Sequence, residues 1–92
     1  MERLHLRIRG RVQGVCYRAY ASDKARALGL SGEVRNRSDG SVELIADGGR
    51  PTLQALLDWC WQGSPAAQVD AIDAAWSDAT GEQVGFHVKA TR

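Results

Sequence analysis

The order in which two hydrophobic periodicities follow one another limits the fold of this chain more than any other feature. Apolar residues alternate with polar ones, as in half-buried strands, in residues 4–12, 32–36, 42–46, 69–76 and 84–90. They recur at helical spacing from Cys16 to Leu28 and from Pro51 to Cys60. Right-handed crossovers place both helices of such an order on one face of a mainly antiparallel sheet. The sequence therefore predicts an α+β sandwich of the ferredoxin-like type (βαββαβ), with residues 84–90 as an additional or edge strand.

Turn residues and apolar stripes refine this prediction. Gly29 is expected to end the first helix, and the Asp39–Gly40 pair to form a hairpin turn. The buried stripe of the first helix is predicted to hold Tyr20, Ala21, Lys24, Ala25 and Leu28, and that of the second Leu53, Leu56, Leu57 and Cys60. The last strand is predicted to have an apolar face of Val84, Phe86, Val88 and Ala90.

Composition excludes several classes of protein. The chain has 92 residues, 43% hydrophobic and 25% charged, which fits a single globular domain over residues 1–92. No apolar run is long enough to span a membrane, and the charged N-terminal segment is unlike a signal peptide, so we expect a cytoplasmic protein without membrane contact. The net charge of +1 does not favour binding to nucleic acid. The two cysteines have no zinc-type spacing, so no metal or cofactor is expected; a single Cys16–Cys60 disulfide remains open.

The stretch GRVQGVCYR places Arg18 at the start of the first predicted helix, after a glycine-containing turn. A cation is unfavourable at a helix N-terminus, because the unpaired amides already make that end positive. The arrangement is explained if the turn binds an anion, since consecutive N–H groups there can converge on a phosphate or carboxylate and Arg18 can pair with it. A surface arginine after a turn is the alternative.

Two further residues qualify as candidates. Asn36 shares the inward phase of Val34, so its carboxamide has either a hydrogen-bonding role or the ordinary role of an asparagine before a turn. Cys16 is a candidate nucleophile, because a thiol at a helix N-terminus beside an arginine can have a lowered pKa. Cysteine phosphatases, however, need a long loop between cysteine and arginine, and here only Tyr17 intervenes; a packing role for Cys16 is favoured.

The outward face of the predicted sheet is basic but lacks aromatic residues. His5, Arg7, Arg9, Arg35 and Lys89 are expected there. RNA-binding sheets stack bases on aromatic side chains, so this face is interpreted as a solvated charged surface.

Two sequence blocks together resemble the signatures of the acylphosphatase family. The first is Gly10-x-Val-Gln-Gly-Val-x-Tyr-Arg18, and the second is Gly32-x-Val-Arg-Asn36 followed by Gly40-x-Val42 and Gly48. The segments SPAAQVDAIDAAW and GFHVKATR are also similar to later strands of the family. Glu33 departs from the pattern, because the family usually has an aromatic residue there.

The resemblance implies a metal-independent hydrolase that cleaves the carboxyl–phosphate bond of acyl phosphates. It implies that the loop residues Gln13, Gly14, Val15, Cys16, Tyr17 and Arg18 bind the phosphoryl oxygens, that Arg18 grips them bidentately, and that Asn36 positions the attacking water. Inorganic phosphate is then expected as product and competitive inhibitor, and the protein as a monomer.

Two alternatives of other classes stay open at this point. One is a non-catalytic anion-sensing module on the same fold, because a fold does not determine function. The other is an acylphosphatase-like part of a larger carbamoyl-transfer protein. The end of the sequence at Arg92 is taken as an argument against this second alternative. Turnover of benzoyl phosphate would separate an enzyme from both.

Overall fold

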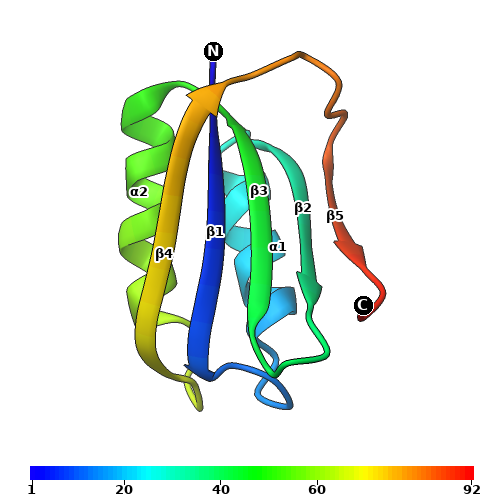
Figure 1. The fold of residues 1–92 in the computed structure, drawn as a ribbon. Helices are drawn as coiled ribbons and strands as arrows, with labels where there is room; N and C mark the ends of the chain where they lie inside the picture. The colour runs from blue at the N-terminus through cyan, green and yellow to red at the C-terminus, as the bar shows by residue number, and fades with distance from the viewer.

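The computed structural model describes all 92 residues as one sheet with two helices packed on one of its faces (Figure 1). The strands are β1 (Glu2–Arg11), β2 (Ser31–Asn36), β3 (Val42–Gly48), β4 (Gln68–Asp78) and β5 (Phe86–Lys89); the helices are α1 (Tyr17–Ala27) and α2 (Arg50–Gln62). The spatial order of the strands is β4-β1-β3-β2-β5. All pairs are antiparallel except β2 with β5, which is parallel. The predicted ferredoxin-like sandwich is confirmed.

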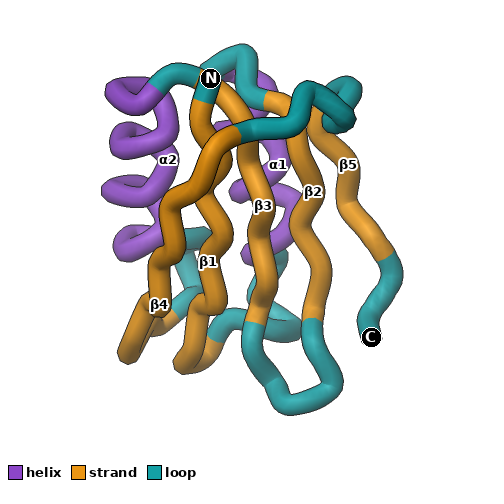
Figure 2. Tube along the Cα trace, turned by 45° about the horizontal axis from the view of Figure 1, so that its top comes forward, coloured by secondary structure: helices purple, strands orange, loops and turns teal.

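The two helices form a layer behind the sheet (Figure 2), and the buried apolar side chains of the core come from both layers. Alternate residues of β1 and β3 face the helices, and Leu4, Leu6, Ile8, Val42 and Leu44 are fully buried there. The helices cover them with Ala21 and Ala25 from α1 and with Leu53, Leu56 and Cys60 from α2. β1 is an interior strand paired with both β3 and β4, and the candidate loop begins where it ends.

Two details of the predicted stripes are wrong. In α1 the buried aromatic side chain is Tyr17, whereas Tyr20 is 46% exposed, because the turns of the helix bring Tyr17, Ala21 and Ala25 to the inner face. In the last predicted strand only Phe86 is buried, while Val84 and Val88 are exposed, and Val84 lies before β5, which begins at Phe86. β5 is an edge strand whose contacts with the helices are mainly with α1, so its inward face is only partly covered.

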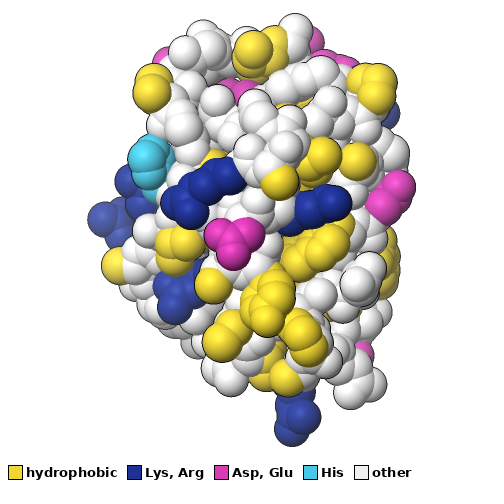
Figure 3. Space-filling model, turned by 180° about the vertical axis from the view of Figure 1, so that it is seen from behind, with side chains coloured by type: hydrophobic (Ala, Val, Ile, Leu, Met, Phe, Trp, Pro, Cys, Tyr) yellow, Lys and Arg dark blue, Asp and Glu magenta, His cyan; other side chains and the backbone are white.

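Exposed apolar side chains remain on the helix face, which Figure 3 shows from behind. The large ones on the helices are Tyr20 in α1 and Trp61 in α2. Neither helix is long and apolar enough to cross a membrane. Both cysteines are free thiols, Cys16 exposed and Cys60 buried, so the structure contains no disulfide between them.

A β-bulge interrupts β1 shortly before the candidate loop. The register of β1 with β4 shifts between Arg9 and Gly10. At Gly10 φ is +129°, and a Cβ atom there would lie 2.2 Å from the carbonyl oxygen of Gln68. Only glycine fits such a close approach of two backbones.

Candidate active site

The loop between β1 and α1 has the backbone geometry of an anion-binding turn. Gly14 has φ +73°, and Cys16, the N-cap of α1, has φ 61° and ψ 23°, the left-handed conformation. Cys16 is the only residue other than glycine with positive φ in the chain, and this conformation costs about 1–2 kcal/mol for an L-residue. Such strain in a binding loop is offset by the surrounding structure and points to a functional backbone.

The amides of this loop have no acceptors within the protein. No backbone hydrogen bond uses the N–H of Gly14, Val15 or Cys16 as donor, and no side chain caps the N-terminus of α1. The first turn of α1 also contains no acidic residue. The helix dipole and the free amides therefore present a concentrated positive potential at this point.

Arg18 adds a full charge to that potential. Its side chain lies in the first turn of α1, and Nη1 donates to the carbonyl oxygen of Lys89 at 3.0 Å. Arg18 takes part in no ion pair, whereas arginines elsewhere in the chain face carboxylates. β5 thus orients the guanidinium without neutralising it.

Asn36 contributes to the site from a different element. It is the last residue of β2 and lines the same hollow as residues from the start of α1. Its Oδ1 atom is buried and has no hydrogen-bond partner. A buried carbonyl oxygen without a partner costs free energy unless water or a ligand satisfies it.

These groups line one hollow of about 400 Å³. Its walls are Val12, Gly14, Cys16, Tyr17, Arg18, Ala19, Asn36 and Val88. The structure therefore brings together the predicted residues Gly14, Cys16, Tyr17, Arg18 and Asn36. Sequence reasoning did not assign Val12, Ala19 and Val88 to the site. They supply apolar surface, and of the three only Val12 stands in one of the two signature blocks.

Gln13 and Val15 belong to the loop but do not line the hollow. The Gln13 side chain donates through Nε2 to the carbonyl oxygens of Arg37 at 2.7 Å and Ser41 at 2.8 Å. It thereby ties the loop to the β2–β3 turn that follows Asn36. The carbonyl oxygen of Val15 accepts a hydrogen bond from Ser64 Oγ at 2.7 Å.

Tyr17 supports the loop from within the core. Its ring is 1% exposed, and its hydroxyl donates to the carbonyl oxygen of Cys60 at 2.7 Å. Burial, with a smaller contribution from Cys60, raises the pKa of the Tyr17 phenol above its ordinary value. Burial likewise raises the pKa of the Cys60 thiol to about 12. Both groups therefore stay protonated at neutral pH and serve packing.

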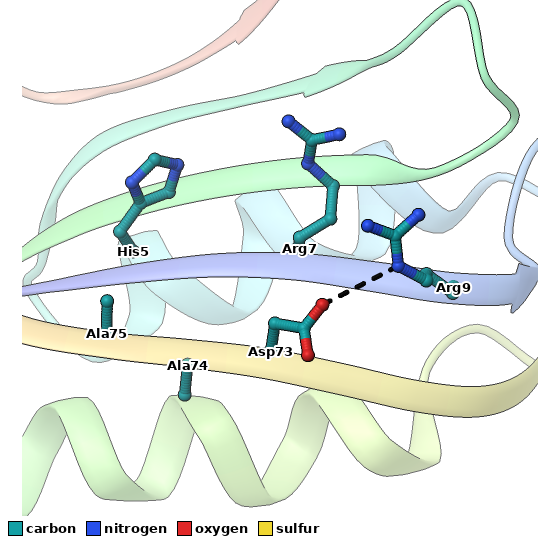
Figure 4. Close-up of a pocket in the computed structure, with 6 residues that line it drawn as sticks. All are labelled: His5, Arg7, Arg9, Asp73, Ala74 and Ala75. Carbon is teal, nitrogen blue, oxygen red and sulfur yellow. Dashed lines mark ion pairs between the residues drawn. The ribbon is translucent and has the colours of Figure 1, made fainter.

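A second hollow lies on the open face of the sheet and is chemically different (Figure 4). It is lined by His5, Arg7, Arg9, Asp73, Ala74 and Ala75. Arg9 Nε lies 3.6 Å from Asp73 Oδ2, and Arg7 Nη1 lies 3.3 Å from Asp39 Oδ2. His5 Nε2 lies 2.6 Å from Glu43 Oε2. The positive groups here face carboxylates, which agrees with a solvated charged face.

The arrangement at the loop suits a tetrahedral anion held by backbone amides and one planar guanidinium. The chain has no group of three or more His, Cys, Asp or Glu side chains that could hold a metal ion. The positive groups that this hollow offers to an anion are the loop amides, the helix N-terminus and Arg18.

Comparisons with known proteins identify the family of this chain. Residues 4–88 match the family model for acylphosphatase. An acylphosphatase of Methylococcus capsulatus is 50% identical over 88 residues, which are 96% of this chain and 96% of that protein. An acylphosphatase of Shewanella amazonensis is 44% identical over 96% of this chain and 97% of its own length.

The similarity extends to three dimensions. The crystal structure of acylphosphatase from Bacillus subtilis matches with a TM-score of 0.94 and 32% sequence identity, and the match covers 97% of this chain and 99% of that one. The family resemblance of the two sequence blocks is therefore confirmed over nearly the whole chain. The chain belongs to the acylphosphatase family of hydrolases.

Proposed function

We propose that the chain hydrolyses the carboxyl–phosphate bond of acyl phosphates, giving a carboxylate and inorganic phosphate. Water attacks the phosphoryl group while the 13–18 loop and Arg18 hold it. One observation carries this proposal: a single hollow combines free loop amides, an arginine without a carboxylate partner and a buried, unpartnered Asn36 Oδ1. Family membership supplies the reaction class.

The loop and Arg18 bind the phosphoryl oxygens. The amides of residues 14–18 donate from the concave backbone, and the planar guanidinium donates two parallel hydrogen bonds. Arg18 Nη1 also donates to Lys89, so the guanidinium is oriented before substrate arrives. These donors stabilise the charge that spreads over the equatorial oxygens in the transition state.

Asn36 positions the nucleophile. Its Oδ1 accepts a hydrogen bond from the attacking water, which leaves an oxygen lone pair directed at phosphorus. The rigid end of β2 and the Gln13 contact to the following turn fix this geometry. Positioning of this kind accounts for a large part of the rate of a reaction between two bound groups.

The reaction needs no strong general base. The leaving carboxylate of an acyl phosphate is a stable anion, so little nucleophilic push is required from the water. The water proton passes to a phosphoryl oxygen of the substrate or to the departing carboxylate. The bond from phosphorus to the carboxyl oxygen breaks with both electrons on the carboxylate.

Several properties follow from this proposal. Inorganic phosphate occupies the same loop, so it is both product and competitive inhibitor. Activity needs no metal or cofactor. We further propose that residues 1–92 act as a single domain, as a monomer, in the cytoplasm.

Benzoyl phosphate hydrolysis in EDTA tests the function directly. We expect turnover that divalent metal does not increase, and competitive inhibition by inorganic phosphate. A chain that binds phosphate but does not hydrolyse benzoyl phosphate would be an anion-binding module instead. Complete loss of turnover in EDTA with recovery on adding a divalent ion would contradict the metal-independent mechanism.

A further inference from the structure

Ser64 connects the segment that follows α2 to the 13–18 loop, which is distant in the sequence but adjacent in the structure. It lies in the segment between α2 and β4 and is 2% exposed. Its Oγ donates to the carbonyl oxygen of Val15 at 2.7 Å, a contact between residues 49 positions apart in the sequence. The Ser64 backbone is itself held by a turn, because its carbonyl accepts the N–H of Ala67 at 2.9 Å.

Because the peptide bond is planar, the hydrogen bond from Ser64 to the Val15 carbonyl also determines the direction of the Cys16 N–H. The chain has no cis peptide, so the C=O of Val15 and the N–H of Cys16 point in opposite directions within one plane. Ser64 anchors the carbonyl end of that plane. The N–H end is therefore turned away from Ser64, and Cys16 itself lines the hollow with Arg18 and Asn36.

We propose that Ser64 is a positioning residue for the reaction: its hydroxyl fixes the Val15–Cys16 peptide so that the Cys16 N–H donates to the bound phosphoryl group. This inference rests on the proposed function, in which the 13–18 loop binds phosphate. Ser64 touches neither substrate nor water and acts only through the loop.

The strained conformation of Cys16 explains why such an anchor is needed. A cysteine with φ 61° gains free energy by relaxing to the right-handed region, and this relaxation rotates the peptide plane next to it. The Ser64 hydrogen bond opposes the rotation from one side. On the other side Tyr17 is held by its hydrogen bond to Cys60, so the end of α2 supports the loop at two neighbouring points.

The experiment compares Ser64→Ala with Asp47→Asn, a control that alters another buried polar residue. Asp47 is 3% exposed and pairs with Arg3 at 2.8 Å near the start of β1, whereas the loop follows the end of that strand. Asp47→Asn therefore weakens a buried polar contact without touching the site. For wild type and both variants, the inhibition constant of inorganic phosphate, kcat/KM for benzoyl phosphate, Tm and the amide NMR shifts during phosphate titration are measured.

We expect wild-type amides of residues 14–18 to move downfield on phosphate binding, because each donates to an anion. In Ser64→Ala the Cys16 amide should lose most of this shift while Gly14 retains it, and phosphate affinity and kcat/KM should fall roughly tenfold, less than the full loss of one preorganised donor. Asp47→Asn should lower Tm and leave the Cys16 shift and phosphate affinity unchanged.

The outcomes separate this inference from the function beneath it. If no loop amide of the wild type responds to phosphate, the proposed binding loop itself is wrong. If the wild type responds and Ser64→Ala keeps the Cys16 shift and the phosphate affinity, only the Ser64 role is overturned. Should Ser64→Ala fail to fold, the isosteric pair Ser64→Thr and Ser64→Val makes the same comparison, since only threonine retains the hydroxyl.

Discussion

Two hollows of this molecule hold arginines, and they differ in what faces those arginines. On the open face of the sheet, Arg7 and Arg9 lie within 4 Å of Asp39, and Arg9 also faces Asp73. At the end of β1, Arg18 has no carboxylate partner and is oriented by a carbonyl oxygen of β5. The first group is neutralised within the protein, while the second retains its full charge for a ligand.

The comparison shows that free charge and free donors, more than the number of cations, distinguish a binding site. The sheet face has more basic residues than the loop. Its polar groups are already satisfied, so a ligand would have to displace ion pairs of modest strength in water. The loop combines Arg18 with unpaired amides and the unpartnered Asn36 Oδ1, and in the proposed mechanism all of them gain a partner from an anion and its water.

The largest expected effect comes from removing the Arg18 guanidinium, which has no carboxylate partner. Arg18→Ala should lower kcat/KM for benzoyl phosphate by roughly 10³-fold or more, as for arginines that stabilise a transferring phosphoryl group. Arg18→Lys should be nearly as damaging, because an ammonium cannot reproduce the planar fork that holds two oxygens. Steady-state kinetics measure both variants.

Arg9→Ala is the matched control on the sheet face. It removes an arginine whose partners are Asp39 and Asp73, and it should leave kcat/KM within about twofold of wild type, since a surface ion pair contributes little. Near-normal activity for Arg18→Lys, or a large loss for Arg9→Ala, would remove the distinction between the two hollows.

The next effect concerns Asn36. Asn36→Ala should fold normally and still bind phosphate through the loop and Arg18, but its kcat should fall by about 10²-fold or more, equivalent to about 3 kcal/mol. Asn36→Asp should in addition weaken phosphate binding, because it sets a carboxylate opposite an anion. The measurements are kcat, phosphate affinity and Tm on the same three proteins.

The alternative for Asn36 is a turn residue with no chemical role. In that case Asn36→Ala would lower stability by about 1 kcal/mol and keep its turnover. A destabilised but fully active alanine variant would therefore rule out water positioning.

A smaller effect, on stability alone, is expected at the sheet face. Burial alone raises the pKa of Glu43, but the hydrogen bond and charge of His5 and the charges of Arg37 and Arg7 outweigh it and lower the pKa below its ordinary 4.5. A carboxyl with a lowered pKa in the folded state stabilises the protein above its unfolded pKa, and this stabilisation is lost as pH falls through the folded pKa.

Glu43→Gln should therefore lower Tm at pH 7 by roughly 2–5 °C, and the difference from wild type should shrink below about pH 4. Its kcat should not change, because Glu43 lies on the face opposite the loop side of the sheet. Thermal melts between pH 3 and pH 7 measure the first effect. A Tm difference that grows on acidification would contradict the sign of this linkage.

The fold could be predicted from periodicity because each strand and helix buries one face. The prediction was wrong at Val88, since an alternating pattern does not reveal that an edge strand lacks cover, and at Val84, which lies before the start of β5. It was also wrong at Tyr20, where the apolar stripe was extended to a residue that the helix turns outward. The parallel pairing of β5 with β2 has no sequence signal of its own.

The candidate site could be predicted only where a motif marks it. Arg18 and Asn36 stand in the two family blocks, and both line one hollow of the structure. The carbonyl oxygen of Lys89 and the hydroxyl of Ser64 act across 71 and 49 positions of sequence, respectively. A backbone carbonyl has no residue type to recognise, and a serine after a helix is common, so tertiary structure alone identifies these partners.

The smallest expected effect concerns Cys16, which lines the same hollow as Arg18 and is exposed. The proposed mechanism uses only its backbone, in the left-handed conformation that presents its amide. Serine accepts this backbone about as poorly as cysteine and has nearly the same size, so the loop should be retained.

Cys16→Ser should therefore keep benzoyl phosphate turnover within about threefold of wild type, since it removes neither a donor nor a charge from the site. A thiol nucleophile would lose nearly all its turnover with serine, because a hydroxyl without an adjacent base is far less nucleophilic than a thiolate. The mass of the protein quenched during turnover distinguishes the same two cases, because only covalent catalysis adds a phosphoryl group at Cys16. Retained turnover without such an adduct would place the chemistry on the water held by Asn36 and the charge stabilisation on Arg18 and the loop amides.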